Sequence, residues 1–254
     1  MTDRRTIDLG TTVAGVRFPF CAMNASGAWS STAAELRDLA CSETGAIVLH
    51  TATVHPFVHP QYRSLHNAGF DKLVPLACEL AAAACRPVVA SIAGATVDEY
   101  ATLARAFSEG GAALVEANLA EPYVAATLAP CEDRDTLRLL LRRLADASTV
   151  PVSVKLPERV LLGYRVLGAE LEAAGVRVVV ARNDFHGFEK LMLEAGTPLE
   201  VIVIGGIRSG YDVLRAVGKG ARAVQVDSEL VREGPGIFTR LKGEMRKARG
   251  ERSG

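Results

Sequence analysis

Eight short apolar runs alternate with helical patterns along this chain of 254 residues. Most of the runs are nearly continuous in apolar residues, as parallel strands are when helices cover both of their faces. They occupy residues 20–26, 46–53, 87–94, 113–120, 150–156, 176–182, 200–206 and 223–228. Eight strand–helix units predict an α/β fold, a (β/α)8 TIM barrel, with an open doubly wound sheet as the alternative.

Amphipathic segments with helix-start signals separate the runs. Residues 96–111 begin with Thr96 and carry Glu99 three residues later, a spacing that predicts a capping box. Before the first run, residues 6–20 alternate around a turn, which predicts an N-terminal β-hairpin on the barrel floor. No linker interrupts the pattern, so we expect one domain over residues 1–254.

The composition is that of a globular protein with a large core, since 49% of the residues are hydrophobic and 23% are charged. A formal net charge of zero gives no basic footprint for nucleic acid or anionic lipid. No apolar run approaches the ~20 residues of a membrane helix, and no signal peptide is expected. Five scattered cysteines without a C-x-x-C pair indicate reduced thiols and a cytoplasmic location. We therefore expect a small-molecule substrate.

Polar residues stand where several of the predicted strands end. His50 lies in the second half of the second run, Asn118 lies near the end of the fourth, and Lys155 lies near the end of the fifth. Because a TIM barrel carries its active site at the C-terminal ends of its strands, these side chains are expected to share one site.

Several segments resemble the class 1 dihydroorotate dehydrogenases, which are FMN-containing barrels. The similarity is carried by "FPFCAMNASGAWSS", "GAIVLHTATVHP", "VPVSVKLPE" and "IGGIRSGYDVLRAVGKGARAVQVDSEL", and it extends over most of the chain. The resemblance implies a TIM-barrel oxidoreductase with FMN as its cofactor, assembled as a homodimer.

The resemblance also implies a set of cofactor-binding residues. They are Ala25, Ser26, Gly27, Asn118, Lys155, Asn183, Gly205, Gly206 and Ser228. In this set Gly205 and Gly206 would offer backbone N–H groups to the phosphate. Lys155 would stabilise negative charge on the reduced ring.

The segment after the fourth strand departs from the family pattern. The family motif is Asn-x-Ser-x-Pro-Asn with a cysteine base inside it, and here the segment reads "NLAEPY". The serine is replaced by Ala120, the cysteine by Glu121 and the last asparagine by Tyr123. His50 stands where the family has a flavin-contacting lysine. This loop is therefore interpreted as a rebuilt catalytic loop.

Other ligand contacts differ as well. The loop that holds orotate is shortened to "SLHNAGFDKL", which leaves Asn67 and His66. The glycine-rich loop after the sixth strand is missing, and Asp227 replaces a glycine beside Ser228. We therefore expect a substrate other than dihydroorotate, and we leave open the loss of the flavin.

The predicted catalytic residues are Glu121, Lys155 and His50, and the predicted substrate-binding residues are His66, Asn67 and Tyr123. A water-poor barrel mouth would raise the pKa of Glu121 and make it a general base, whereas a solvated loop glutamate is the alternative. The histidine-rich loop after the second strand could suggest a metal, but no carboxylate or cysteine pair matches it, so no metal is expected.

Three functions remain open on the sequence. The first is an FMN-dependent oxidoreductase acting on another small substrate, with specialised metabolism as one setting. The second is a flavin-free barrel enzyme that performs acid–base chemistry, such as an isomerase or lyase, and the third is a non-catalytic paralogue.

Overall fold

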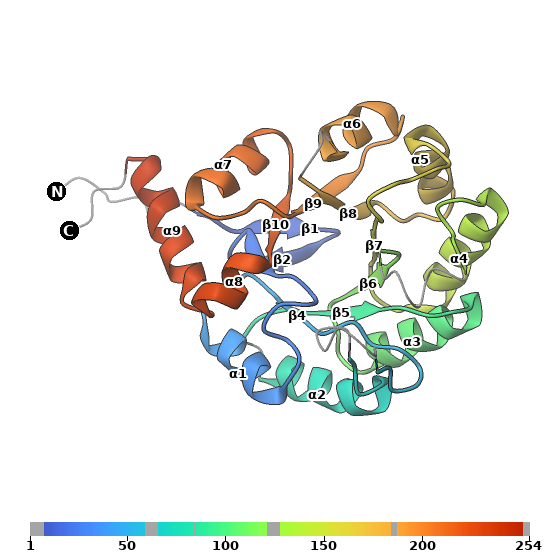
Figure 1. The fold of residues 1–254 in the computed structure, drawn as a ribbon, viewed down its shortest axis with the longest axis horizontal. Coiled ribbons are helices and arrows are strands. Elements are labelled where there is room, and N and C mark those ends of the chain that lie inside the picture. Colours follow the sequence, from blue (N-terminus) through green and yellow to red (C-terminus); the bar gives the residue numbers. More distant parts are fainter. Residues whose placement is uncertain (1–7, 59–65, 84, 121–127, 184–186, 251–254) are drawn as a thin grey trace.

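The computed structural model describes residues 8–58, 66–83, 85–120, 128–183 and 187–250, and its strands form a ring enclosed by helices (Figure 1). The ring consists of β3 (Ala22–Asn24), β4 (Ile47–Val48), β5 (Val88–Ile92), β6 (Leu114–Asn118), β7 (Val152–Lys155), β8 (Val178–Arg182), β9 (Glu200–Ile204) and β10 (Ala223–Val226). These strands pair in parallel in the order β3-β10-β9-β8-β7-β6-β5-β4. Each strand lies inside one of the eight predicted runs, so the barrel prediction is confirmed.

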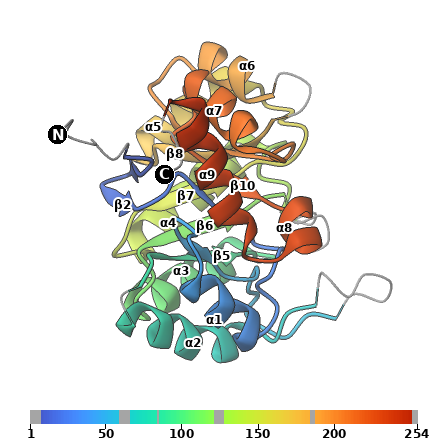
Figure 2. The ribbon, with the colours of Figure 1, turned by 90° about the vertical axis from the view of Figure 1, so that its left-hand side faces the viewer.

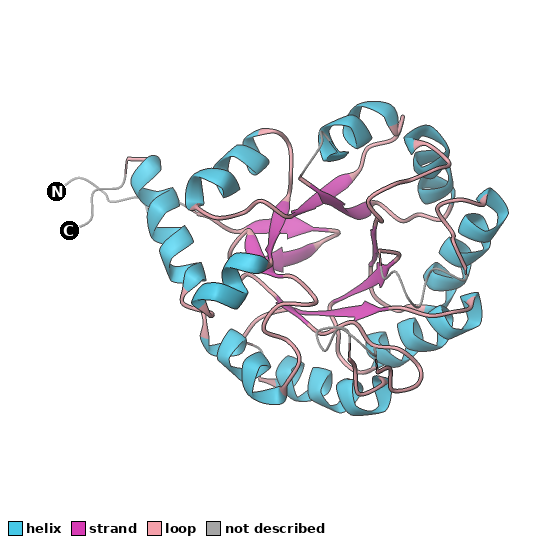
Figure 3. Ribbon diagram, in the orientation of Figure 1, coloured by secondary structure: helices cyan, strands magenta, loops and turns pink. Residues whose placement is uncertain are grey.

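Helices follow the strands and form the outer layer, except for the short helix α8, which lies at one end of the barrel (Figure 2 and Figure 3). They are α1 (Ala33–Cys41), α2 (Phe70–Ala82), α3 (Val97–Glu109), α4 (Arg134–Ala147), α5 (Tyr164–Ala173), α6 (Gly187–Glu194), α7 (Gly210–Gly218), α8 (Ser228–Glu233) and α9 (Ile237–Ala248). None of the helices in the described ranges combines the length and the apolar character needed to cross a bilayer.

The predicted hairpin is present as β1 (Thr11–Val13) and β2 (Val16–Phe18), which pair antiparallel. Val13 and Phe18 are fully buried and join the apolar cluster inside the barrel. The N–H of Ala14 donates to a carboxylate oxygen of Glu200 on β9 at 3.0 Å. Figure 2 shows the hairpin at one end of the barrel and α8 at the other, so the hairpin covers the floor and leaves the strand C-termini open.

The ring closes between β3 and β4 through a side chain. The Asn24 Nδ2 donates to the Val48 carbonyl at 2.7 Å, and the Val48 N–H donates to the Asn24 Oδ1 at 2.8 Å. One backbone bond, from the Gly45 N–H to the Ala22 carbonyl at 2.8 Å, lies beside this pair. A side-chain amide carries the same donor and acceptor as a peptide group, so Asn24 takes the place of a strand residue at this seam.

The start of α3 differs from the prediction. The Thr96 side chain accepts a hydrogen bond from the Glu99 N–H at 3.2 Å, as in a capping box. The Glu99 carboxylate, however, accepts from the N–H of Ala95 at 2.7 Å, one residue before the helix cap. The start of the helix was therefore predicted correctly. The predicted hydrogen bond from the Thr96 N–H to the Glu99 carboxylate was wrong, because Ala95 is the donor.

A buried carboxylate joins α4 to α5 in the outer layer. Glu170 is 4% exposed and accepts hydrogen bonds from Arg138 at 3.0 and 3.1 Å and from Arg134 at 2.6 Å. These bonds, with those from Arg138 contributing most, lower the pKa of Glu170 to about 2. The charged form of Glu170 therefore stabilises the pairing of the two helices.

The Glu170→Gln variant tests this carboxylate by its pH dependence. A lowered pKa in the folded state gives stability that is fully present above the unfolded glutamate value of about 4.3 and is lost as the pH falls through about 2. At neutral pH we expect the variant to lose roughly 1–3 kcal/mol of unfolding free energy, because charge-assisted bonds disappear. The difference from the wild type should shrink as the pH falls towards 2 in urea titrations. Glu172→Gln, an exposed change on the same helix, is the control; a pH-independent difference for Glu170→Gln would contradict the assignment.

Candidate functional site at the open end of the barrel

The buried apolar residues separate into two layers, and this separation shows which side chains point into the barrel. Leu114 of β6 and Val178 of β8 belong to the interior cluster, whereas Val115 and Val179 belong to the cluster between strands and helices. Side chains alternate along a strand, so Asn118 lies on the interior side of β6. The same argument places His50, Ser91, Lys155 and Gln225 on the interior side.

Lys155 is the central charged group of this interior surface. Its ammonium group donates to the Ser26 Oγ at 3.1 Å, and its side chain is 12% exposed. In the sheet register Lys155 is opposite Asn118 on the neighbouring strand. The structure therefore brings together three of the predicted cofactor residues: Ser26, Asn118 and Lys155.

A chain of hydrogen bonds orients Asn118. Its Nδ2 donates to the Thr51 Oγ1 at 3.1 Å, and the Thr51 hydroxyl shares a hydrogen bond with the Ser91 hydroxyl at 3.0 Å. On the other side, the Asn118 Oδ1 accepts from the Ala120 N–H at 3.1 Å. Asn118 thus fixes the backbone at the point where the chain enters the segment of Glu121. Glu121 and Tyr123 themselves lie outside the described residues.

His50 is buried at the end of β4, with 6% exposure. Burial lowers the pKa of the His50 imidazole, and backbone hydrogen bonds with Ser26 and His66 oppose that change. Within the described part of the chain, the His50 Nδ1 has no hydrogen-bond partner. The lowered pKa favours the neutral imidazole near pH 7, with Nδ1 buried beside the interior surface of the barrel.

The loop after β4 holds the two predicted substrate residues His66 and Asn67, both half-buried. The backbone of Asn67 pairs with that of Phe57 through two bonds of 3.0 Å. The Asn67 Oδ1 accepts from the Thr53 Oγ1 at 2.8 Å and from the Gly69 N–H at 3.0 Å. The carboxamide oxygen of Asn67 therefore stabilises the loop itself, and the Nδ2 group is the part that a substrate could use.

The predicted phosphate residues Gly205 and Gly206 lie at the end of β9, beside the end of β8, where the predicted cofactor residue Asn183 lies. Gly205 and Gly206 have φ of 91° and 69°, in the left-handed region that favours glycine. A Cβ at Gly205 would meet nothing within 4 Å, and one at Gly206 would meet only the Asn183 Nδ2, at 3.4 Å. Two accessible backbone positions and a side-chain amide therefore lie together at this side of the mouth.

A negative charge stands at the end of the neighbouring strand, because Asp227 follows directly after β10, which pairs with β9. Ser228 begins the six-residue helix α8 and follows Asp227 directly. Asp227 is exposed, and its side chain makes no capping hydrogen bond to the helix. Because the carboxylate is solvated, its repulsion of a nearby anion is screened.

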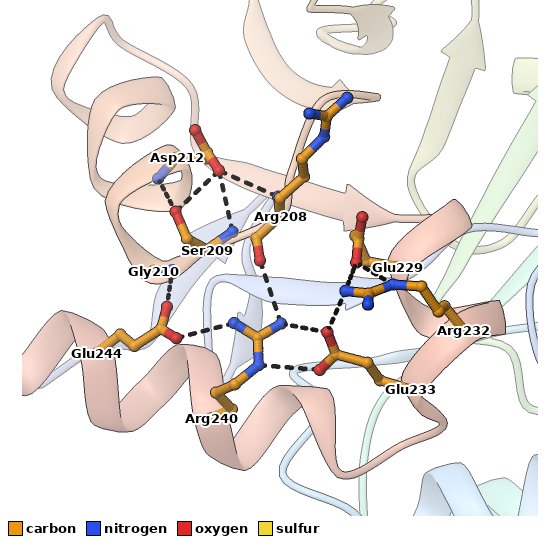
Figure 4. Close-up of polar contacts among 9 residues, drawn as sticks. All are labelled: Arg208, Ser209, Gly210, Asp212, Glu229, Arg232, Glu233, Arg240 and Glu244. Atoms are coloured by element: carbon orange, nitrogen blue, oxygen red, sulfur yellow. Dashed lines mark hydrogen bonds and ion pairs between the residues drawn. The ribbon is translucent and has the colours of Figure 1, made fainter.

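An ion network fixes the loop after β9 to the last helices (Figure 4). Arg240 of α9 bonds to Glu233 at 2.9 Å, to Glu244 at 2.8 Å and to the Arg208 carbonyl at 3.1 Å. Glu244 in turn accepts from the Gly210 N–H at 2.6 Å. Two backbone positions that follow the Gly205–Gly206 pair are thereby held, so the network supports the geometry of the predicted phosphate site.

The sequence did not identify two polar residues in the barrel interior. Glu116 is completely buried on β6, and its Oε2 accepts from the Gln225 Nε2 at 2.6 Å. Its Oε1 lies 3.9 Å from the Lys155 Nζ. The signal was available, because Glu116 has the same strand parity as Asn118 and is the one charged residue in the run 113–120.

The buried cysteines are not candidates for nucleophiles. All five cysteines are free, and Cys21 and Cys131 are buried. Burial raises the pKa of the Cys131 thiol to about 12 and that of Cys21 to about 11. Both thiols are therefore protonated near neutral pH.

The sequence is similar to that of known dihydroorotate dehydrogenases. Residues 8–186 match the family described as dihydroorotate dehydrogenase. A dihydroorotate dehydrogenase (fumarate) of Trypanosoma cruzi is 28% identical over 274 aligned positions, covering 88% of this chain and 87% of the relative. Dihydroorotate dehydrogenase A (fumarate) of Lactococcus lactis is 25% identical over 291 positions, covering 93% of each chain. Both alignments are longer than the 254 residues of this chain, so the relatives carry residues that this chain lacks.

Solved structures agree in fold. The ligand-free DHODH of Eimeria tenella superposes with a TM-score of 0.83 at 15% identity, covering 98% of this chain and 90% of that one. The structure of the same enzyme in complex with ferulenol gives a TM-score of 0.82, covering 96% and 85%. With the family match spanning most of the sequence, this chain belongs to the dihydroorotate dehydrogenase family, a family of oxidoreductases.

Proposed function

We propose that the protein is an FMN-dependent oxidoreductase that acts on a small substrate other than dihydroorotate. The observation that carries the proposal is the contact between the Lys155 ammonium group and Ser26, beside Asn118, at the open end of the barrel. A homodimeric assembly and a cytoplasmic location stay predictions.

The described residues fit a flavin. Gly205 and Gly206 leave open space over their backbones and have Asn183 beside them, as a phosphate cradle requires. On the other side of the mouth, Lys155 supplies a positive charge, and the backbone at Ala25 and Ser26 has small side chains that leave room for a flat ring. FMN, when bound, would supply two-electron redox chemistry that no amino-acid side chain offers.

The chain's own residues would bind the substrate and move its proton. Lys155 would support negative charge on the ring. His50, whose lowered pKa favours the neutral imidazole, would be a candidate proton acceptor. Glu121 remains the alternative base, and it lies outside the described residues.

The departure from dihydroorotate rests on the sequence differences in the pocket. Ala120, Glu121 and Tyr123 replace three side chains of the family motif, and the loop with Asn67 is short. In that loop the carboxamide oxygen of Asn67 already accepts hydrogen bonds from the loop itself. Each polar group of dihydroorotate that is buried without its partner would cost about 1–3 kcal/mol, so the loss of several partners weakens its binding.

A comparison of two glycine variants tests the cofactor. Gly206→Ala and Gly196→Ala both place a side chain at positive φ, 69° and 71°, but Gly196 lies in the loop after α6 on the opposite side of the barrel from the mouth. Both should therefore lose similar stability. Only Gly206→Ala should weaken FMN binding, by about tenfold, because its Cβ would occupy the predicted cradle. Titration of FMN into apoprotein, followed by flavin fluorescence, measures this.

The wild type should show a flavin absorption band at about 450 nm, and denaturation should release the flavin into solution. Addition of dihydroorotate without oxygen should leave the band unbleached. Bleaching would overturn the substrate part of the proposal. Protein that is colourless and takes up no FMN would overturn the flavin part and favour the flavin-free enzyme.

A further inference from the structure

Glu116 lies inside the barrel directly below the proposed flavin site. It is the third residue of β6, opposite Ser91 and Ser153 in the register, and its side chain is 1% exposed. An ionised carboxylate in such a place is destabilising unless it has charged or hydrogen-bonding partners. The identity of its partners therefore indicates what this carboxylate does.

The two carboxylate oxygens of Glu116 have different surroundings. Oε2 accepts a hydrogen bond from the Gln225 Nε2 at 2.6 Å. Oε1 is buried and has no hydrogen bond within the described residues, and the Gln225 Oε1 is in the same situation. The charged group that faces Oε1 is the Lys155 ammonium, at 3.9 Å. Gln225 thus fixes the carboxylate so that its other oxygen is directed at Lys155.

Lys155 connects this buried charge to the mouth. Its ammonium group donates to the Ser26 Oγ at 3.1 Å, so it lies between Glu116 below and the flavin-lining segment above. Replacing a buried ion pair by apolar residues is often neutral or stabilising, so stability alone does not account for this arrangement.

We propose that Glu116 is a positioning residue for Lys155. It holds the ammonium group against Ser26 and offsets its positive charge, and Gln225 orients it for this purpose. The inference rests on the proposed FMN site, because the charge of Lys155 matters to the reaction only if it lies beside the ring.

A double-mutant cycle in FMN-free protein tests the coupling. Lys155→Met leaves Glu116 buried without its counter-charge and should lower the melting temperature by on the order of 10 °C. Glu116→Gln has the same shape and should change it little, because the amide can bond to the orphaned Gln225 oxygen. The double variant Glu116→Gln/Lys155→Met should recover most of the loss. Additive effects would overturn the coupling.

The reduction potential of bound FMN tests the role. With its counter-charge removed in Glu116→Gln, Lys155 should favour the reduced, negative flavin, raising the equilibrium constant for reduction by about tenfold or more. Lys155→Met should shift the potential in the opposite direction. Glu170→Gln removes another buried glutamate, one that accepts hydrogen bonds from Arg134 and Arg138 in the helical layer, and should leave the potential unchanged.

An unchanged potential in Glu116→Gln would overturn the positioning role. The failure of the proposed function is distinguishable from this outcome. If the wild type takes up no FMN, the flavin proposal fails. The double-mutant cycle in FMN-free protein still measures whether Glu116 and Lys155 are coupled. Additive changes in melting temperature would overturn that coupling independently of the flavin.

Discussion

Replacing Asn24 by alanine is expected to lower the free energy of unfolding by roughly 2–6 kcal/mol, a large fraction of the stability of an ordinary domain. Asn24 is fully buried, and its amide bonds to both backbone polar groups of Val48. Alanine would leave the N–H and the carbonyl of Val48 unpaired inside the barrel wall, at about 1–3 kcal/mol for each group.

The local packing gives the chain no simple repair. At Gly45, beside the seam, a Cβ would lie 1.8 Å from the Phe20 carbonyl oxygen, so the two segments already approach as closely as they can. Urea unfolding of Asn24→Ala measures the effect. The control is Asn183→Ala, whose side chain makes no hydrogen bond in the described part of the chain and which should lose less than about 1 kcal/mol. Equal losses for the two variants would show that Asn24 does not hold the seam.

The barrel was predictable from the sequence because its physical signal is local. Parallel strands covered on both faces are continuous apolar runs, and all eight runs contain an observed strand. The seam was not predictable. Whether Asn24 bonds to Val48 depends on the distance between two strands, and the sequence shows Asn24 only as a polar residue at a strand end.

The site also contains residues that the sequence predicted and residues that only the structure revealed. Ser26, Asn118 and Lys155 were predicted from motifs, and the structure places them together. The lowered pKa of His50 depends on burial that no local pattern encodes. Glu116 could have been placed on the interior side from its parity with Asn118, but its partners Gln225 and Lys155 come from other strands, and only the structure shows them.

Asn118→Leu is expected to weaken FMN binding by about 100-fold, the largest effect on the cofactor of any single change at the mouth. The branched side chain would fill space that the amide leaves for a flat ring, and it has no polar group for the ligand. It would also release the Ala120 N–H and the Thr51 hydroxyl, which Asn118 now engages at 3.1 Å each. FMN titration of the apoprotein provides the measurement.

Tyr100→Phe is the matched control for Asn118→Leu. The Tyr100 hydroxyl donates to the backbone carbonyl of Asn118 at 3.1 Å, and it does so from the helix side of β6. Its loss should lower stability by about 1 kcal/mol and leave FMN affinity unchanged. The FMN affinity of Thr51→Val should lie between those of Asn118→Leu and Tyr100→Phe. This variant leaves Asn118 in place but removes the hydroxyl that accepts from its Nδ2 group. An Asn118→Leu protein that binds FMN as tightly as Tyr100→Phe would place the flavin elsewhere, because a side chain that contacts the ring cannot be exchanged for a branched apolar one without loss of affinity.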